Sequence, residues 1–224
     1  METVTQPQMA TPLQVQGQDR ELPNAALRLL FLSIEELMGK DGMKAVLNGA
    51  RMSYYIDNYP PSNLDYGVSF SQYGKVEQAV EDFYGPRGAR AMLVRVGRGT
   101  FQYGMKEQSA VLGLAGQALK SMPFISTQAK MKLLLQQMVA AANKTVNQPA
   151  RLEEGADSFT IVIDQCMCEY RPRHQLPCCY VTVGAFSEAM KWLTEKQFEI
   201  KEITCLNLGA DACRYRIPKQ PNEA

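Results

Sequence analysis

Histidine is almost absent from this sequence of 224 residues, in which His174 is the single example. Metal sites built only from histidines, and mechanisms that need two histidines in one chain, are therefore excluded. An excess of one charge is also lacking, because 24 Lys and Arg nearly balance 23 Asp and Glu and leave a net charge of +1. A near-neutral chain lacks the basic surplus of a general nucleic-acid or anionic-membrane binder.

Long apolar runs are missing as well. No segment approaches the roughly 18 apolar residues of a membrane-spanning helix. The first 18 residues are rich in Gln, Thr and Pro and lack the apolar centre of a signal peptide. We therefore expect a cytoplasmic protein. We expect residues 1–22 to be a flexible tail, residues 23–218 a single domain and residues 219–224 a short C-terminal tail.

The first two thirds of the domain has the apolar spacing of helices. A helix is expected from Asn24 as its N-cap to Met38, because Leu27, Leu30 and Phe31 fall on one face and Gly39 follows. Tyr- and Pro-rich residues 54–73 predict an irregular loop. Further helices are expected at 42–49, 75–84, 87–106 and 107–120, and at an apolar stripe from Met131 to Ala142.

After Pro149 the pattern changes to short β segments. Strands are predicted at 151–154 and 159–164, a helix at 180–196, and two more strands at 198–205 and 213–217 joined around Gly209. Helices followed by a strand–strand–helix–strand–strand unit indicate an α+β fold, with a helical layer packed on an antiparallel sheet.

All six cysteines lie in this last part of the chain. Cys205 and Cys213 stand four residues to either side of Gly209, so a hairpin there would bring their sulfurs together. Glu202 lies three residues before Cys205, and Cys179 begins the preceding helix. Three thiolates and one carboxylate can form the closed tetrahedral shell of a structural zinc ion, and soft sulfur ligands favour zinc over magnesium or calcium.

Simpler interpretations of the cysteines stay open. Buried thiols are ordinary core residues, and Cys205 and Cys213 could instead form a disulfide. Cys178 could also replace its neighbour Cys179. A regular strand would point Glu202 and Cys205 to opposite faces, so a metal site needs a bulge or a strand end between them.

The order Cys179-Tyr-Val-Thr-Val-Gly184, Glu202-Ile-Thr-Cys205 and Gly209-Ala-Asp-Ala-Cys213 resembles the C-terminal signature of the 4-vinyl reductase domain family. That family also supplies hydrocarbon-sensing domains of phenol- and xylene-responsive activators, and its fold is related to Golgi transport-complex subunits. The resemblance implies a ligand-binding fold of the nitric-oxide-signalling and Golgi-transport type. It also implies a zinc ion held by Cys179, Glu202, Cys205 and Cys213.

The same resemblance implies that the domain binds a small hydrophobic molecule between helices and sheet, such as an aromatic hydrocarbon or a tetrapyrrole. Zinc would fix the C-terminal segment beside the ligand, and two copies would pair through the first helix. Twelve Met residues supply adaptable apolar side chains, among them Met105, Met122, Met131 and Met138 of the expected helical layer. We therefore expect a sensor or carrier domain that a protein partner reads.

The alternative is an enzyme, a vinyl reductase or its accessory subunit acting on a divinyl (bacterio)chlorophyll precursor in bacteriochlorophyll biosynthesis. The glycines near Gly97 lack the spacing of a dinucleotide-binding loop, and no phosphate-binding lysine motif is present. His174 and Cys178, four residues apart in an expected loop, give little support for a nucleophile. The sequence therefore favours binding over catalysis.

Two features have no place in this scheme. Cys166 and Cys168 form a C-x-C pair outside the four-ligand pattern, and could be packing residues, spare ligands or a redox pair. The basic residues of the helix expected at 87–106 indicate a solvated face, or a contact with an acidic partner.

Overall fold

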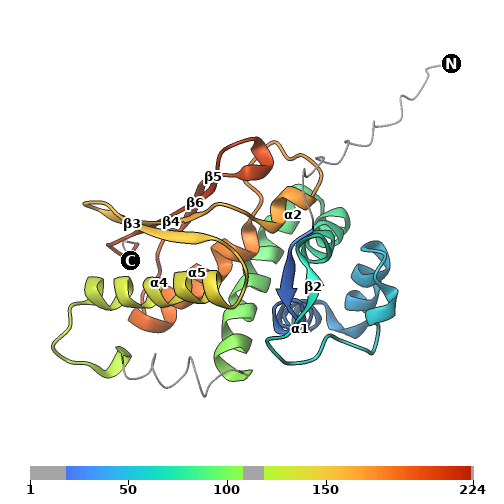
Figure 1. The fold of residues 1–224 in the computed structure, drawn as a ribbon, viewed down its shortest axis with the longest axis horizontal. Coiled ribbons are helices and arrows are strands. Elements are labelled where there is room, and N and C mark those ends of the chain that lie inside the picture. Colours follow the sequence, from blue (N-terminus) through green and yellow to red (C-terminus); the bar gives the residue numbers. More distant parts are fainter. Residues whose placement is uncertain (1–18, 108–118, 223–224) are drawn as a thin grey trace.

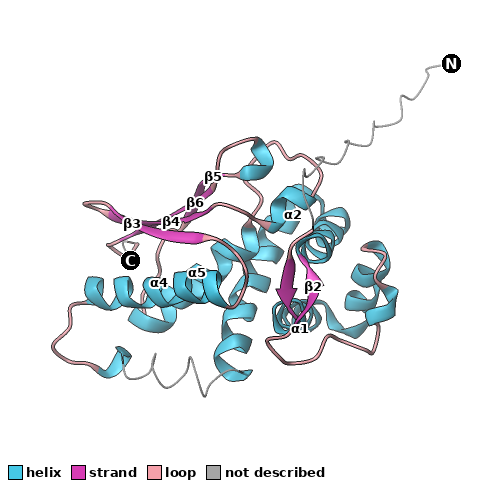
Figure 2. Ribbon diagram, in the orientation of Figure 1, coloured by secondary structure: helices cyan, strands magenta, loops and turns pink. Residues whose placement is uncertain are grey.

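The computed structural model describes residues 19–107 and 119–222. Most of the helix expected at 107–120, most of the expected N-terminal tail and the last two residues of the expected C-terminal tail lie outside these ranges. Helices and strands occur in the order β1 (Glu21–Pro23), α1 (Asn24–Gly49), β2 (Tyr66–Ser69), α2 (Phe70–Glu107), α4 (Thr127–Lys144), β3 (Ala150–Glu154), β4 (Ser158–Ile163), α5 (Tyr180–Thr194), β5 (Lys201–Thr204) and β6 (Cys213–Pro218). Figure 2 shows the helices gathered below and beside a small sheet.

The predicted α+β architecture is confirmed. Strands β3, β4, β6 and β5 form an antiparallel sheet in that order. In Figure 1 this sheet lies over α4 and α5, while α1 and the two-stranded β1–β2 sheet lie at the other side of the molecule. Helix α2 packs against both α1 and α5 and so joins the two halves.

Glycines break the two long helices where the sequence predicted helix ends. Gly39 in α1 has a φ of 72°, and Gly85 in α2, directly before Pro86, has a φ of 67°. Residues with side chains rarely adopt this left-handed conformation. Each helix is therefore two straight segments joined at a bend.

The described residues form two apolar cores. One lies among α1, both segments of α2 and the β1–β2 sheet. The other lies between the four-stranded sheet and helices α4 and α5, and it includes the cysteines. Met131 is fully buried in this second core and Met138 packs against it, whereas Met122 is 44% exposed.

Helices α2 and α5 cross at Gly97 and Gly184 with no side chain between their backbones. A Cβ atom added at Gly97 would lie 2.0 Å from the carbonyl oxygen of Val181. One added at Gly184 would lie 2.1 Å from the carbonyl oxygen of Val94. This close approach fixes the position of α5, whose first turn begins directly after Cys179.

The sequence pattern did not predict the two-stranded β1–β2 sheet. Residues 19–22 were expected in a tail, but Glu21 and Leu22 pair with β2, and Leu22 is fully buried. Likewise β2 and the start of α2 lie within the expected loop of residues 54–73. Pairing with a distant strand, which local spacing does not reveal, orders both segments.

Within the described residues, no helix is both long and apolar enough to cross a membrane.

Candidate metal centre

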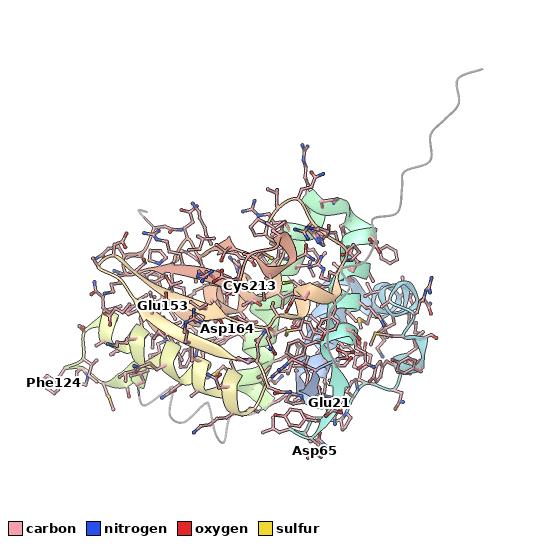
Figure 3. The ribbon with its side chains drawn as sticks, turned by 45° about the horizontal axis from the view of Figure 1, so that its top comes forward. Glu21, Asp65, Phe124, Glu153, Asp164 and Cys213 are labelled. Atoms are coloured by element: carbon pink, nitrogen blue, oxygen red, sulfur yellow. The ribbon has the colours of Figure 1, made fainter. Side chains whose placement is uncertain are left out.

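The six cysteines, spread over 48 positions of the sequence, come together in one buried cluster. Each is at most 3% exposed. Cys166 and Cys168 lie at a short 3-10 helix (Met167–Tyr170), Cys178 and Cys179 precede α5, Cys205 follows β5 and Cys213 begins β6. Figure 3 shows Cys213 in the interior of the molecule, where the sheet meets the helices.

The four predicted ligands lie together. The sulfurs of Cys179, Cys205 and Cys213 and a carboxylate oxygen of Glu202 are all within 4.8 Å of one another. The irregularity that such a site requires is present, because the β5–β6 register shifts between Glu202 and Thr204 and β5 ends before Cys205. Gly209, with a φ of 90°, then reverses the chain toward Cys213.

The sulfur–sulfur distances suit a shared metal ion and not disulfides. Neighbouring Sγ atoms are 3.6 Å apart for Cys166–Cys179, 3.6 Å for Cys168–Cys213 and 3.8 Å for Cys179–Cys213. A tetrahedron with zinc–sulfur bonds of about 2.3 Å has edges of about 3.8 Å. A disulfide requires about 2.05 Å. All six cysteines are free thiols here, so a Cys205–Cys213 disulfide is not formed.

Glu202 has the environment of a metal ligand. Its Oε2 accepts a hydrogen bond of 2.9 Å from the backbone N–H of Cys179, whereas its buried Oε1 has no partner. Burial, together with the neighbouring Cys205 sulfur, raises the pKa of Glu202 to about 9. An unpartnered buried carboxylate oxygen is costly, and a cation beside the sulfurs would satisfy it.

Sequence reasoning gave no role to Cys166 and Cys168, yet the structure brings both into the cluster. Their sulfurs lie with those of Cys179 and Cys213 inside a second group whose members are all within 4.8 Å of one another. The available signal was the C-x-C spacing, since residues two apart in an extended chain face the same side. Cys178 belongs to neither group.

Hydrogen bonds among the six neighbouring thiols shift their pKa values. Hydrogen bonds from Cys168 and other neighbouring thiols hold the pKa values of Cys166 and Cys205 below the ordinary thiol value. Hydrogen bonds with neighbouring thiols raise the pKa values of Cys168, Cys179 and Cys213 instead. Thiolate is the form that binds metals, so the lowered pKa values of Cys166 and Cys205 favour metal binding at these two sulfurs.

Asn207 ties the two cysteine-bearing loops together. Its fully buried side chain donates hydrogen bonds of 2.8 Å to the carbonyl oxygen of Cys168 and 3.0 Å to that of Pro172. Its Oδ1 accepts a bond of 2.7 Å from the backbone N–H of His174. The loop before α5 is therefore held against the turn after Cys205 by groups other than the sulfurs.

A buried ionic network holds the same loop against α2. The guanidinium of Arg171, which is 0% exposed, donates to the carbonyl oxygen of Cys178 and to Glu81 at 2.6 Å. His174 Nε2 also lies 3.1 Å from Glu81. Burial alone would raise the pKa of Glu81, but hydrogen bonds from His174 and Arg171 outweigh burial and lower it.

No family model matches the chain, and no curated protein matches it in sequence. Solved structures do match. The H-NOX protein of S. oneidensis in its Fe(II)NO state superposes with a TM-score of 0.55 at 13% identity, covering 88% of this chain and 99% of that chain. A variant of the Tt H-NOX protein gives a TM-score of 0.54 at 12% identity, covering 91% and 98%.

The fold is that of the H-NOX proteins. The phenol-responsive sensory domain of the transcription activator PoxR, solved with phenol, overlaps more loosely, with a TM-score of 0.46 at 15% identity over 69% of this chain and 77% of that chain. At these identities the H-NOX structures establish the arrangement of helices and sheet and leave the ligand to be argued from this chain's residues.

A further matching structure, with a TM-score of 0.51 at 13% identity, concerns heme redox potential, and a histidine can hold haem iron. His174 is the single histidine. Its Nδ1 lies 2.7 Å from the carbonyl oxygen of Pro172, and its Nε2 contacts Glu81 and Arg171. Both ring nitrogens are engaged in the loop network. The chain's residues therefore do not fit a histidine-held haem, and the cysteine cluster is its candidate cofactor site.

Proposed function

We propose that this chain is a zinc-containing domain that binds a small hydrophobic molecule and acts as a sensor or carrier. The H-NOX-type fold, shared over nearly the whole of the matching chains, supports this proposal. One of those proteins is seen in an Fe(II)NO ligation state, so the fold serves small-molecule binding elsewhere.

The hydroxyl of Tyr215 carries the proposal. Tyr215 lies on β6, is 0% exposed, and its hydroxyl has no hydrogen-bond partner. Its ring meets that of Phe186 from α5 edge to face, with centroids 5.4 Å apart. A buried hydroxyl without a partner costs about 1–3 kcal/mol. A ligand with one polar atom and an apolar body, bound between α5 and the sheet, would recover that cost.

The candidate metal site lies on the same face of the sheet as this hydroxyl. Cys213, Tyr215 and Ile217 alternate along β6 as its buried residues, so all three point toward the helices. Glu202 is the cross-strand partner of Tyr215. Zinc at Cys179, Glu202, Cys205 and Cys213 would fix the start of α5 to the ends of β5 and β6, and so hold the wall beside the ligand.

A matched pair of probes tests the proposal. Phenol and toluene have nearly the same size, but phenol alone can hydrogen-bond to Tyr215. Titration calorimetry with the full chain should show binding of both, with phenol tighter by up to about tenfold. In Tyr215→Phe the two affinities should become similar. The same change at the exposed Tyr66 is the control and should preserve the preference.

Two results would contradict this site. Absence of binding of both probes to the wild-type chain would overturn the hydrophobic-ligand proposal for aromatics of this size. Alternatively, an unchanged phenol preference in Tyr215→Phe would place the ligand elsewhere.

We further propose that the domain works as a homodimer paired through α1 and that a protein partner reads the bound state. Arg87, Arg90 and Arg95 are exposed on the second segment of α2 and provide a basic surface for an acidic partner. Analytical ultracentrifugation of the full chain tests the dimer, and a monomer at micromolar concentration would contradict it.

A further inference from the structure

The two groups of metal-binding residues in the cluster overlap. One consists of Cys179, Glu202, Cys205 and Cys213, and the other of Cys166, Cys168, Cys179 and Cys213. Cys179 and Cys213 belong to both. The groups are also in direct contact, because the sulfurs of Cys205 and Cys168 are 3.9 Å apart. The cluster is thus one continuous set of five sulfurs and a carboxylate.

One tetrahedral ion leaves part of this set unused. If an ion takes the predicted group, the thiols of Cys166 and Cys168 remain, each 3.6 Å from a sulfur of the occupied site. If it takes the other group, the buried Oε1 of Glu202 remains without a partner. Neither choice satisfies all the donors that the fold brings together.

The segment that carries Cys166 and Cys168 is positioned independently of any metal. The backbone N–H of Cys166 donates to the Glu169 carboxylate at 3.1 Å, and Asn207 holds the carbonyl oxygen of Cys168. On the other side, an alanine at Gly74 of α2 would bring its Cβ within 2.8 Å of the carbonyl oxygen of Met167. Both thiols are therefore presented to the cluster by a packed and hydrogen-bonded backbone.

We propose that the cluster holds two zinc ions bridged by the thiolates of Cys179 and Cys213. One ion is completed by Glu202 and Cys205, as in the zinc site proposed above on which this inference rests, and the other by Cys166 and Cys168. Cys166, Cys168 and Cys205 each exchange an S–H bond for one S–Zn bond, and the bridging Cys179 and Cys213 each exchange theirs for two. The five thiol protons, and the proton of the Glu202 carboxyl, pass to solvent. Tetrahedral sites rich in sulfur suit zinc.

The charges support a second ion. One zinc ion with three thiolates and a carboxylate carries two formal negative charges. The second ion adds two positive charges and its two terminal thiolates add two negative ones, so the buried net charge does not rise. The second ion thus makes ligands of the Cys166 and Cys168 thiols without increasing the electrostatic cost of burying the cluster.

The experiment is zinc titration of the metal-free, reduced full chain, followed by native mass spectrometry. The wild-type chain should take up two zinc ions. The variant with both Cys166→Ser and Cys168→Ser should retain one, and so should Glu202→Gln. Cys178→Ser is the matched control, because it removes a buried thiol outside both groups and should still bind two.

A cobalt titration of the wild-type chain tests whether Cys179 and Cys213 bridge the two ions. With Co²⁺ in place of zinc, the electron paramagnetic resonance signal should grow with the first equivalent and fall with the second, because bridging thiolates couple the two spins. Circular dichroism identifies any variant that fails to fold. In that event, the wild-type zinc count and cobalt titration decide the question alone.

The outcomes separate this inference from the zinc site on which it rests. One zinc in the wild-type chain, unchanged by the Cys166 and Cys168 substitutions, would overturn the second ion and keep the first. No zinc would overturn both. Iron and inorganic sulfide in place of zinc would show that the cluster is an iron–sulfur site and would also overturn the inference.

Discussion

The sulfurs of Cys179 and Cys213 lie 3.8 Å apart although 34 positions separate the two residues in the sequence. Cys179 directly precedes α5 and Cys213 begins β6, so this pair joins the helical layer to the sheet. Both candidate donor groups contain it. Any metal at this cluster therefore links the two layers that enclose the proposed ligand site.

Replacing Cys213, like replacing Cys179, should have a larger effect than replacing any of the other four cysteines. Cys213→Ser removes a ligand common to both groups, so we expect complete loss of zinc and a stability loss above about 4 kcal/mol. That loss corresponds to a melting temperature roughly 10 °C lower. Thermal melts with and without a chelator measure it. The chelator should destabilise the wild-type chain and Cys178→Ser but leave Cys213→Ser unchanged, and a chelator-insensitive wild type would contradict the prediction.

The crossing of α2 and α5 predicts a sharp contrast between two glycines of one helix. Gly97→Ala would force its Cβ against the backbone of α5, and overpacking of this kind costs about 1–3 kcal/mol or more. Gly104→Ala meets only Leu29, at 3.7 Å, and should be neutral or stabilising by up to about 1 kcal/mol. Urea unfolding compares the variants. Equal stabilities for the two would show that the helices do not approach this closely.

Replacing Asn207 should lower both the stability of the fold and the affinity for zinc. Asn207→Ala removes the acceptor of the backbone N–H of His174 and one of the donors to the carbonyl oxygens of Cys168 and Pro172, so we expect a destabilisation of about 1–3 kcal/mol. Zinc affinity should also fall, because the two ligand-bearing loops lose their link. Competition with a chromophoric chelator measures that affinity. Asn58→Ala, at an exposed position, is the control, and equal affinities in both variants would contradict the positioning role.

His174 should make stability fall as the pH rises. Burial alone lowers its pKa, but hydrogen bonds with Cys178 and Glu81 outweigh burial and raise it to about 10. The folded state therefore holds a proton that the unfolded state releases near pH 6.5. The stabilisation is complete below that pH and is lost as the pH approaches 10.

Urea unfolding between pH 6 and 10 tests this dependence, with His174→Gln as the reference because the cysteines also titrate in this range. The stability difference between wild type and variant should shrink steadily with rising pH. A difference that is constant across the range would show that His174 does not carry the proton.

The sequence was sufficient for features that depend on local pattern. The apolar stripe of α4, the β3–β4 hairpin and the glycine breaks of α1 and α2 follow from spacing within a few residues. The irregularity after Glu202 was also predictable, because three residues cannot bring Glu202 and Cys205 to one face of a regular strand.

The features that the sequence did not predict depend on contacts between segments far apart in the chain. Nothing near Leu22 shows that it pairs with Val68, and nothing near Cys166 shows that it will lie beside Cys179. The C-x-C spacing indicates donors on one side of the chain, but their neighbours are set by how the loop packs on α2. Local spacing therefore predicted one candidate metal-binding group and left the role of Cys166 and Cys168 open.

The most direct test of the account is native mass spectrometry of the chain purified under mild, reducing conditions from its own host. We predict a mass that exceeds the polypeptide by zinc and by a small apolar molecule, which is released when the zinc is chelated. A chain that carries neither zinc nor an organic ligand would contradict the account. So would a bound nicotinamide or flavin, which would point to an enzyme.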